Sequence, residues 1–474
     1  MKKYFFILTF FLLNCLCFAQ PNEQEINYAQ LNQTALDHLV NLINIDTAQP
    51  EPKEILAQRY IYKNLIKNKI DWQLYRMEKP RANLIAVLKA QTPKPLEPLI
   101  LISHLDTAAI ADNWQTPPTQ ALIKEGKVYG LGSSDAKNYA AINLTILTWL
   151  KQNNIPLNRD LIFVFSADEE AASEQGLKFL FDKYPDKLKA AYALNEGGGL
   201  IKGEGGKDLF FVESASKMYM DILVSAFGEE SHSATARQKD NAIYKLSQAL
   251  QTIEAHPQEP LLNAWTKKFF EQIYPLQDDD AKTTIDMLLA KDKKLAKQAA
   301  KIIMEDAFLK TQIVNTITPS VLSSGSESNV LEGQAKAILN CRLLPWTNPD
   351  AFFEEINNLF EQDESIVLSI LEKPEMPFPQ PVLEEDDFFK SIKASVEKVF
   401  PNTLTLQAMS PASSESEILR RHGITTYGIG PLMNDGEGGP HQSNENITLD
   451  DFYQQLKLTL AIVLDFAKNK TEDL

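Results

Sequence analysis

The chain has 474 residues, which is long for a single domain and predicts two. A hydrophobic content of 44% and a charged content of 23% are typical of a globular protein that can bury a large core. The formal net charge of −16 argues against nucleic acid and anionic membranes as partners, because both require a basic face.

Residues 1–19 predict a signal peptide. Lys2 and Lys3 precede an apolar stretch, residues 4–18, that is too short to span a bilayer, and we expect cleavage near Ala19. The mature protein would be secreted or periplasmic, without a membrane span, and its net charge would be −18 once two of the 47 basic residues are removed. A lipoprotein signal ending at Cys15 is the weaker alternative, since asparagine is unfavourable before that cysteine.

Cleavage would leave Cys341 as the one cysteine, which excludes an internal disulfide. This residue lies in an apolar run that predicts a buried strand, so cysteine is not expected to act as a nucleophile. The fold must therefore be stabilised by its core rather than by covalent cross-links.

The first half of the mature chain alternates helices and strands. Residues 27–69 have the apolar spacing of amphipathic helices. Beyond them, apolar runs predict strands at 98–103, 161–165, 190–194 and 209–212, and helices at 135–151 and 174–183. Such alternation favours an α/β fold, with a mainly parallel sheet covered by helices and functional sites at the carboxyl ends of its strands.

From residue 217 onward the pattern becomes that of a smaller βαββαβ domain, as in lid or dimerisation domains. Its predicted strands lie at 218–227, near 326–331, at 335–344 and at 365–371, and its predicted helices at 241–254 and 348–362. A lysine- and aspartate-rich stretch at about 257–316 predicts a helical insertion. A helix at 386–399 and a strand at 425–429 resume the first pattern. We therefore expect a large domain, 20–216 with 378–474, that is interrupted by a small domain, 217–377.

Histidines and acids follow the predicted strands of the large domain. His104 ends one strand, and Asp106, two residues later, can orient its imidazole, although a histidine satisfied at a strand end is the alternative. Asp135 follows a glycine-rich loop at the start of a helix, where it could be a metal ligand or a simple N-cap. An aspartate there would repel a pyrophosphate, so the loop does not predict a nucleotide site.

Three adjacent acids, residues 168–170, follow a second strand and repel one another unless cations offset their charge; a solvated acidic loop is the alternative. Glu196 ends a third strand before three glycines, and His441 lies in a late loop. Imidazoles and carboxylates in this combination suit two divalent cations bridged by a carboxylate. The tandem Glu169 and Glu170 would supply a general base beside a metal ligand.

Together these motifs resemble the di-zinc peptidase family that includes glutamate carboxypeptidases, aminoacylases and carboxypeptidase S. The resemblance extends from about residue 30 to the C-terminus. Its motifs are SHLD (103–106), GLGSSDAK (130–137), SADEE (166–170), LNEGG (194–198), ESHSA (230–234), SNVLEG (328–333), CRLLP (341–345) and PHQSNE (440–445).

The resemblance implies two zinc ions per chain, with Co²⁺ or Mn²⁺ as substitutes. Asp135 would bridge the two ions. His104 and Glu196 would complete one site, and Glu170 and His441 would complete the other. The family usually has other residues at Leu131, Asn138, Ser231, Thr235, Ser414 and Glu415, but none of these differences removes a metal ligand.

The resemblance also implies the roles of five further residues. Glu169 would be the general base, and Asp106 would support a metal-binding histidine. His232 of the small domain would polarise the substrate carbonyl, often from the partner subunit of a homodimer. Asn329 and Arg342 would hold a substrate carboxylate, a role that suits a guanidinium.

These features predict a secreted zinc-dependent metallopeptidase or amidohydrolase. It would cleave the amide bond of a small peptide or N-acyl amino acid beside a free carboxylate, using a metal-bridged water activated by Glu169. Aminopeptidase or dipeptidase specificity is an alternative that the sequence leaves open. An exported ligand-binding protein would not need Glu169, and a catalytically silent relative would typically lack a metal ligand, whereas all five are present.

Overall fold

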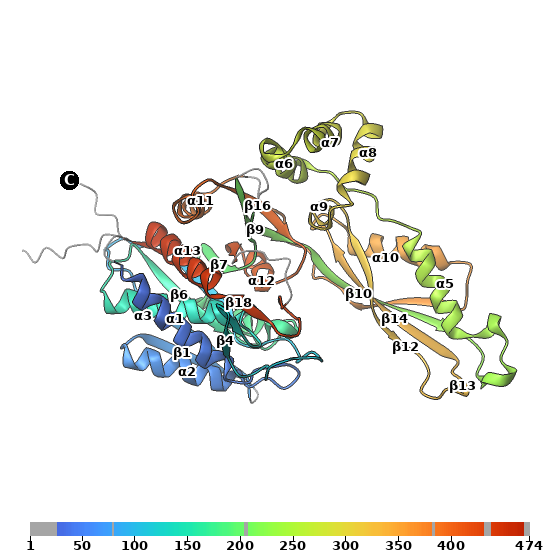
Figure 1. The fold of residues 1–474 in the computed structure, drawn as a ribbon, viewed down its shortest axis with the longest axis horizontal. Coiled ribbons are helices and arrows are strands. Elements are labelled where there is room, and N and C mark those ends of the chain that lie inside the picture. Colours follow the sequence, from blue (N-terminus) through green and yellow to red (C-terminus); the bar gives the residue numbers. More distant parts are fainter. Residues whose placement is uncertain (1–25, 78–79, 203–206, 382–383, 431–437, 469–474) are drawn as a thin grey trace, which may run out of the picture.

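The computed structural model describes residues 26–77, 80–202, 207–381, 384–430 and 438–468, so the predicted signal peptide lies outside the described residues. Two sheets organise this part of the chain (Figure 1). We call the nine-stranded sheet with its flanking helices the large domain, and the four-stranded sheet with helices α5 and α10 the small domain. Across the described ranges, no helix is long and apolar enough to cross a membrane.

The large sheet has a parallel centre formed by β6, β3, β7 and β17 in that order. Antiparallel strands β2 and β1 extend one edge, and β9, antiparallel to β17, leads to β16 at the other. The strands are β1 (Asp71–Arg76), β2 (Ala82–Leu88), β3 (Leu96–His104), β6 (Arg159–Ser166), β7 (Tyr192–Glu196), β8 (Gly199–Ile201, paired with β9), β9 (Asp208–Ser216), β16 (Thr403–Ser410) and β17 (Thr425–Ile429). The mixed sheet with a parallel centre agrees with the predicted fold class.

Alternate residues of the central strands face opposite helical layers, as in a sheet buried on both faces. In β3, Leu99 and Leu101 pack in one core while Ile100 and Ile102 pack in another. The first core contains α1 (Tyr28–Ile43), α2 (Glu54–Lys67), α3 (Lys137–Gln152), α11 (Asp387–Val399) and α13 (Leu449–Ala467), and the second contains α4 (Leu177–Lys183) and α12 (Glu415–Arg421). A separate three-stranded sheet joins β18 (Asn446–Thr448), β5 (Lys127–Tyr129) and β4 (Leu122–Lys124).

The small domain is an antiparallel sheet with the order β12-β14-β10-β15. These strands are β10 (Met218–Phe227), β12 (Thr316–Ser323), β14 (Gln334–Leu343) and β15 (Ile366–Glu372). One face of the sheet packs against α5 (Ala242–Glu254) and α10 (Pro349–Asn357), and buried Cys341 lies in this core. The element order is the predicted βαββαβ.

One predicted strand was misplaced. The prediction put it near 326–331, but the second strand of this sheet along the chain is β12, and only Val330–Leu331 (β13) is extended in the predicted range. β13 pairs instead with β11 (Ser231–His232). The sequence obscured β12 because most of its side chains are exposed at the sheet edge, so it lacks an alternating apolar pattern.

The stretch predicted to be a helical insertion forms α6 (Ala264–Ile273), α7 (Asp279–Leu289), α8 (Lys293–Ile303) and α9 (Ala307–Thr311). These helices pack mainly on the large domain: Phe269 and Phe270 of α6 share a core with Phe211 of β9 and Leu406 of β16. Figure 1 shows them above the junction of the two domains. The insertion therefore covers the β16 edge of the large sheet.

Candidate metal centre

The candidate ligands meet because parallel strands end at one edge of the large sheet. β3 ends at His104, β7 ends at Glu196, and β6 ends at Ser166, shortly before the 3-10 helix Glu169–Ala171. Since β6, β3 and β7 are parallel neighbours, their carboxyl ends lie side by side. The loop before α3 brings Asp135 to the same place.

Asp135 lies between the two histidines and offers each a different oxygen. Its Oδ1 is 3.1 Å from Nε2 of His104, and its Oδ2 is 3.4 Å from Nε2 of His441. Glu196 Oε1 lies 3.6 Å from Nε2 of His104, and Glu170 Oε2 lies 3.0 Å from Nε2 of His441. The structure thus brings all five sequence-predicted ligands together in two sets that share one carboxylate.

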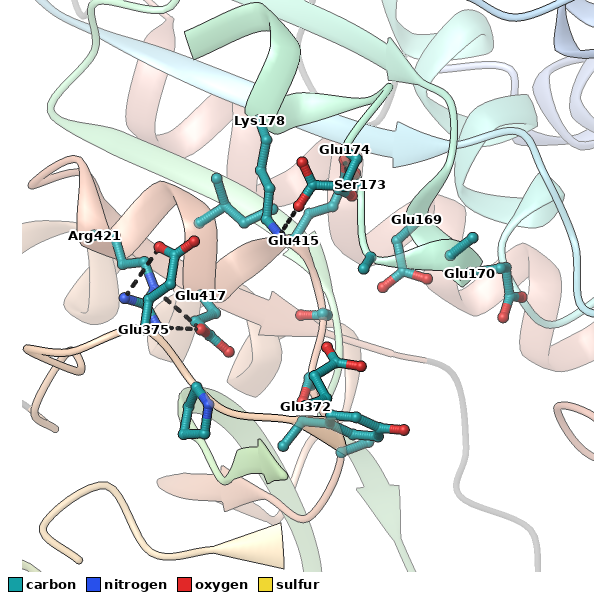
Figure 2. A pocket seen from close by; sticks show the side chains of 18 of the residues that line it. Glu169, Glu170, Ser173, Glu174, Lys178, Glu372, Glu375, Glu415, Glu417 and Arg421 are labelled. Atoms are coloured by element: carbon teal, nitrogen blue, oxygen red, sulfur yellow. Dashed lines mark hydrogen bonds and ion pairs between the residues drawn. The ribbon is translucent and has the colours of Figure 1, made fainter. Parts of the chain in front are cut away.

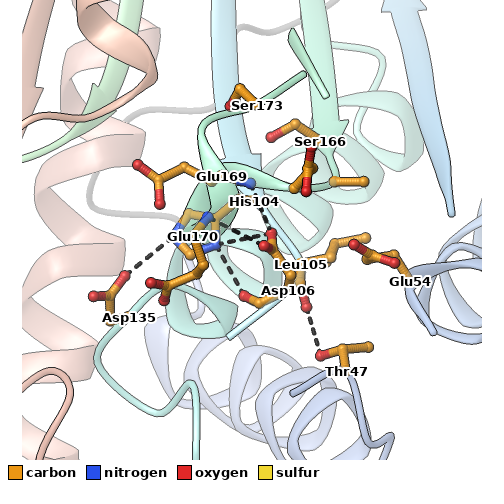
Figure 3. A network of polar contacts seen from close by, with 12 residues as sticks. Thr47, Glu54, His104, Leu105, Asp106, Asp135, Ser166, Glu169, Glu170 and Ser173 are labelled. Atoms are coloured by element: carbon orange, nitrogen blue, oxygen red, sulfur yellow. Dashed lines mark hydrogen bonds and ion pairs between the residues drawn. The ribbon is translucent and has the colours of Figure 1, made fainter. Parts of the chain in front are cut away.

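The tautomer of His104 suits a metal ligand. Its Nδ1 lies 2.9 Å from the backbone carbonyl oxygen of Asp106, which can only accept, so Nδ1 carries the proton (Figure 3). Nε2 then faces Asp135 and Glu196, and would offer its lone pair to a metal ion bound there. A carbonyl partner on the other ring nitrogen is typical of histidines that bind metals.

The charges of the site also fit cations. Burial raises the pKa of Glu169 well above its usual range, and Glu196 and Asp135 add to this effect. Hydrogen bonds to Asp135 and Glu170 raise the pKa of His441 to about 11. Oε1 of Glu170 is buried and, among the described residues, has no hydrogen-bond partner. Mutually repelling carboxylates with a free buried oxygen are what a pair of divalent cations would neutralise.

Two alternatives suggested by the sequence do not match the structure. The N-cap of α3 is Ala136, which makes no side-chain cap, so Asp135 is not a plain helix cap. The acidic segment is not a solvated loop either, because Asp168 is buried and both following glutamates are partly buried. Asp168 instead accepts hydrogen bonds from Gln175 N, at 2.7 Å, and from the guanidinium of Arg81.

Asp106 contacts both His104 and the segment after β6. Its Oδ1 lies 3.6 Å from Nδ1 of His104, an ion-pair contact that is longer than a hydrogen bond. Its carboxylate also accepts hydrogen bonds from the backbone N–H groups of Glu169 and Glu170, both at 3.1 Å, and from Gln49 Nε2 at 2.9 Å. Asp106 therefore holds the segment that carries the candidate base and a candidate ligand.

Sequence reasoning missed Glu445, which supports the loop before α3. Its carboxylate accepts hydrogen bonds from the backbone N–H groups of Gly132, Ser134 and Asp135 at 2.8–3.1 Å. Glu445 is buried, and burial, together with Asp135, raises its pKa to about 7. Its place four residues after His441, in the quoted PHQSNE motif, was the available signal.

A cleft of about 950 Å³ connects the metal centre to the small domain. Glu169, Glu170 and His441 line the large-domain side, and Tyr219, Arg342 and Glu372 line the small-domain side. Figure 2 shows part of this wall, with Glu372 across from the two adjacent glutamates. Arg342 is thus in the same cleft as the candidate base.

His232 and Asn329 are not in this cleft. They lie beside each other at the β11–β13 pair, where Ser233 N donates to the backbone oxygen of Asn329 at 3.0 Å, and both are exposed. The pair lies at the far end of the small domain (Figure 1). Since the ten residues of β14 span about 30 Å, these residues cannot join Arg342, at the other end of β14, within one chain.

Comparison with known proteins places this geometry in a family. The family profile described as Peptidase family M20/M25/M40 matches residues 100–465. An uncharacterized metallohydrolase of Methanocaldococcus jannaschii is 26% identical over 408 residues, which cover 81% of this chain and 85% of that protein. The mouse (Mus musculus) N-fatty-acyl-amino acid synthase/hydrolase PM20D1 is 23% identical over 386 residues, which cover 79% and 74%.

Among solved structures, an M20 family metallo-carboxypeptidase from Sulfolobus solfataricus has the same fold. The TM-score is 0.67 at 19% sequence identity, over 90% of this chain and 98% of that chain. The family match spans most of the chain and includes every residue of the metal centre. The chain therefore belongs to peptidase family M20/M25/M40 and is a metallohydrolase.

Proposed function

We propose that this metallohydrolase binds two zinc ions and cleaves the amide bond of a small peptide or N-acyl amino acid beside a free carboxylate. The observation that carries the proposal is the position of Arg342, which lines the same cleft as the metal centre but on the opposite domain. A guanidinium in a partly buried cleft favours a carboxylate ligand. The mouse relative is named an N-fatty-acyl-amino acid synthase/hydrolase, and the Sulfolobus solfataricus protein is named a metallo-carboxypeptidase.

The five ligands could hold two cations, with His104 and Glu196 at one, Glu170 and His441 at the other, and Asp135 at both. When bound, such cations act as Lewis acids that acidify water and polarise a carbonyl. Cobalt or manganese could replace zinc because imidazole and carboxylate ligands also suit these metals.

Glu169 is the group placed to move protons. It lies with His104 and Glu196 in a cluster whose candidate ligand atoms are within 4.8 Å of one another. Its carboxylate would take a proton from water as the water oxygen attacks the amide carbon. Glu169 would then deliver this proton to the leaving nitrogen as the C–N bond breaks, which yields an amine and a carboxylic acid. Burial raises the pKa of Glu169 above the usual glutamate range, which makes its carboxylate a stronger proton acceptor.

A pair of matched substrates tests the proposal. The purified mature protein should hydrolyse N-acyl amino acids, and a chelator should abolish this activity. Amidating the substrate carboxylate should lower kcat/KM by a factor that corresponds to a loss of about 2–5 kcal/mol in transition-state binding free energy, because the guanidinium would be left unpaired. Arg342→Ala should remove the preference for the free acid. Equal cleavage of free and amidated substrates by the wild-type protein would contradict the proposal and favour aminopeptidase specificity.

We extend the proposal to assembly and location. His232 would act on the substrate of a second copy of the chain, in a homodimer formed through the small domain, because it lies far from its own cleft. We also propose that the protein is exported after removal of residues 1–19. N-terminal sequencing of protein recovered from the medium or periplasm should then begin at Gln20, whereas an intact Met1 would contradict export through this signal.

A further inference from the structure

The cleft-facing side of the small sheet carries a row of four polar residues, and the proposed chemistry assigns a role to Arg342 alone. Tyr219 and Asp221 belong to β10, and they pair across the strands with Arg342 and Asn340 of β14, respectively. Alternate residues of these strands, such as Met220 and Cys341, face the apolar core on the other side. The four polar residues are only partly buried and are not part of that core.

A chain of hydrogen bonds connects these residues and ends at the guanidinium. The Tyr219 hydroxyl donates to Asp221 Oδ2 at 2.6 Å, and Asn340 Nδ2 donates to Asp221 Oδ1 at 3.0 Å. Arg342 Nε donates to Asn340 Oδ1 at 3.1 Å. An ionised aspartate can only accept, so Asp221 dictates that the amide of Asn340 presents its nitrogen to the aspartate and its oxygen to the arginine.

Arg342 is held on two further sides. Its guanidinium carbon lies 4.7 Å from the ring centroid of Tyr219, in a cation–π contact. Its Nη1 donates to Ser413 Oγ, in the loop before α12 of the large domain, at 3.1 Å. These bonds occupy Nε and one Nη1 donor of the five that a guanidinium offers. The remaining donors are those available to a ligand in the cleft.

We infer that Tyr219, Asp221 and Asn340 are positioning residues, which hold the Arg342 fork in the orientation that receives the substrate carboxylate. The inference rests on the function proposed above and concerns specificity. An arginine side chain otherwise loses considerable rotamer freedom when it binds a ligand, and prior anchoring removes that cost from the binding step. Anchoring also fixes the plane of the fork, which a bidentate contact with a carboxylate requires.

The direction of the hydrogen-bond chain provides the test. Asn340→Asp places a second carboxylate against Asp221, and Asn340→Leu removes the acceptor for Arg342 Nε. The double variant Asp221→Asn with Asn340→Asp exchanges the two groups between the strands. The amide, now on β10, would accept from Tyr219 and donate to the carboxylate, now on β14, and that carboxylate would accept from Arg342. Net charge and hydrogen bonds are therefore retained.

The readout is the preference for a free over an amidated substrate carboxylate, measured as KM and kcat for both substrates, with thermal unfolding as the control for folding. We expect Asn340→Asp and Asn340→Leu to raise KM for the free acid by about 10-fold and to leave the amidated substrate unchanged. The double variant should return KM for the free acid to within about 3-fold of wild type. Tyr219→Phe keeps the ring beneath the guanidinium and should change KM less than the Asn340 variants.

The outcomes separate the two proposals. A wild-type protein that does not prefer the free acid overturns the proposed function, and this inference with it. A wild-type preference that folded Asn340→Asp and Asn340→Leu retain in full overturns the inference alone. Loss of the preference without recovery in a folded double variant also overturns it, because the hydrogen-bond chain would then not be the cause.

Discussion

Two carboxylates hold the backbone that carries the metal centre. Asp106 accepts from the N–H groups of Glu169 and Glu170, and Glu445 accepts from three N–H groups of the loop that ends at Asp135. A buried carboxylate with several backbone donors fixes those donors more firmly than a neutral acceptor would. The ligand geometry is therefore determined by residues that need not contact metal.

Glu445 gives a prediction for metal affinity. Glu445→Gln keeps the size of the side chain but turns an amide donor toward backbone donors, so the loop that carries Asp135 should loosen. We expect zinc affinity to fall by about 10–100-fold, as measured by competition with a chelating dye. Glu417→Gln, which changes a cleft acid away from the ligands, is the matched control and should bind zinc like wild type. Wild-type affinity in Glu445→Gln would mean that the loop needs no such anchor.

Glu169 gives a prediction for catalysis. Glu169→Gln removes the base without changing its size, so turnover should fall by about 10²–10⁴-fold while about two metal ions per chain remain bound. Initial-rate assays measure turnover, and metal analysis of the same samples measures the number of bound ions per chain. Glu174→Gln removes a nearby cleft acid and should keep near-normal kcat. A near-normal kcat for Glu169→Gln would show that another group is the base.

At the scale of elements, the junction of the two sheets is tied together by buried polar groups. Lys217 is the single residue between β9 and β10, and its Nζ donates to the backbone oxygen of Val314 at 2.8 Å. Gln312 exchanges hydrogen bonds with the backbone of Met409 in β16, at 3.0 and 3.2 Å. The end of the helical insertion is thus bonded both to the junction and to the edge of the large sheet, which restricts how the small domain turns.

Lys217 also gives a pH prediction. Burial, reinforced by Arg342 and Lys310, lowers the pKa of Lys217 to about 7 from an unfolded value near 10.5. Between these values the unfolded chain binds more protons than the folded one, so this lysine makes folding stability rise with pH, by at most about 1.4 kcal/mol per pH unit. Lys217→Met should flatten the rise between pH 7 and 10 in denaturant unfolding. Parallel stability curves for the two proteins would contradict the shift.

At the scale of the whole molecule, the cleft joins residues from both domains. The small domain brings Arg342 to the cleft at one end of its sheet and carries His232 at the other. When one chain is considered alone, the exposed position of His232 is that of a solvated loop histidine without a catalytic role. A role in catalysis requires a second chain, and this makes the proposal testable by mixing variants.

Co-expressed chains carrying Glu169→Gln and His232→Ala test the shared site. Each variant alone should be nearly inactive. A mixed dimer would contain one site with an intact Glu169 and an intact His232 from its partner, so random pairing should restore about a quarter of wild-type activity. Two affinity tags purify the mixed species. Verified mixed dimers without recovered activity would contradict a histidine shared between subunits.

Much of the fold followed from local pattern. The central strands of the large sheet were predictable because strands buried on both faces are continuously apolar, and β17 was predicted with the bounds that the structure has. β10 of the small sheet was also predicted with its bounds, from its alternating pattern. Edge and peripheral elements were not. β12 at an edge of the small sheet is largely exposed, and β1 at an edge of the large sheet has one buried residue, so both give weak signals. The buried helix α13 was not predicted either.

The motifs of the sequence by themselves indicated the candidate metal ligands. They also indicated that His104, Glu170 and Glu196 would meet, because these residues follow parallel strands that end at one edge of the sheet. Only the tertiary structure decided what supports them. Glu445 contacts a loop more than 300 residues away in sequence, and Asp106 accepts from the backbone of the segment after β6 while it remains beside His104. The tertiary structure also separates Arg342 from His232 and Asn329. Arg342 lies at one end of β14, and the other two residues lie near its opposite end, about 30 Å away.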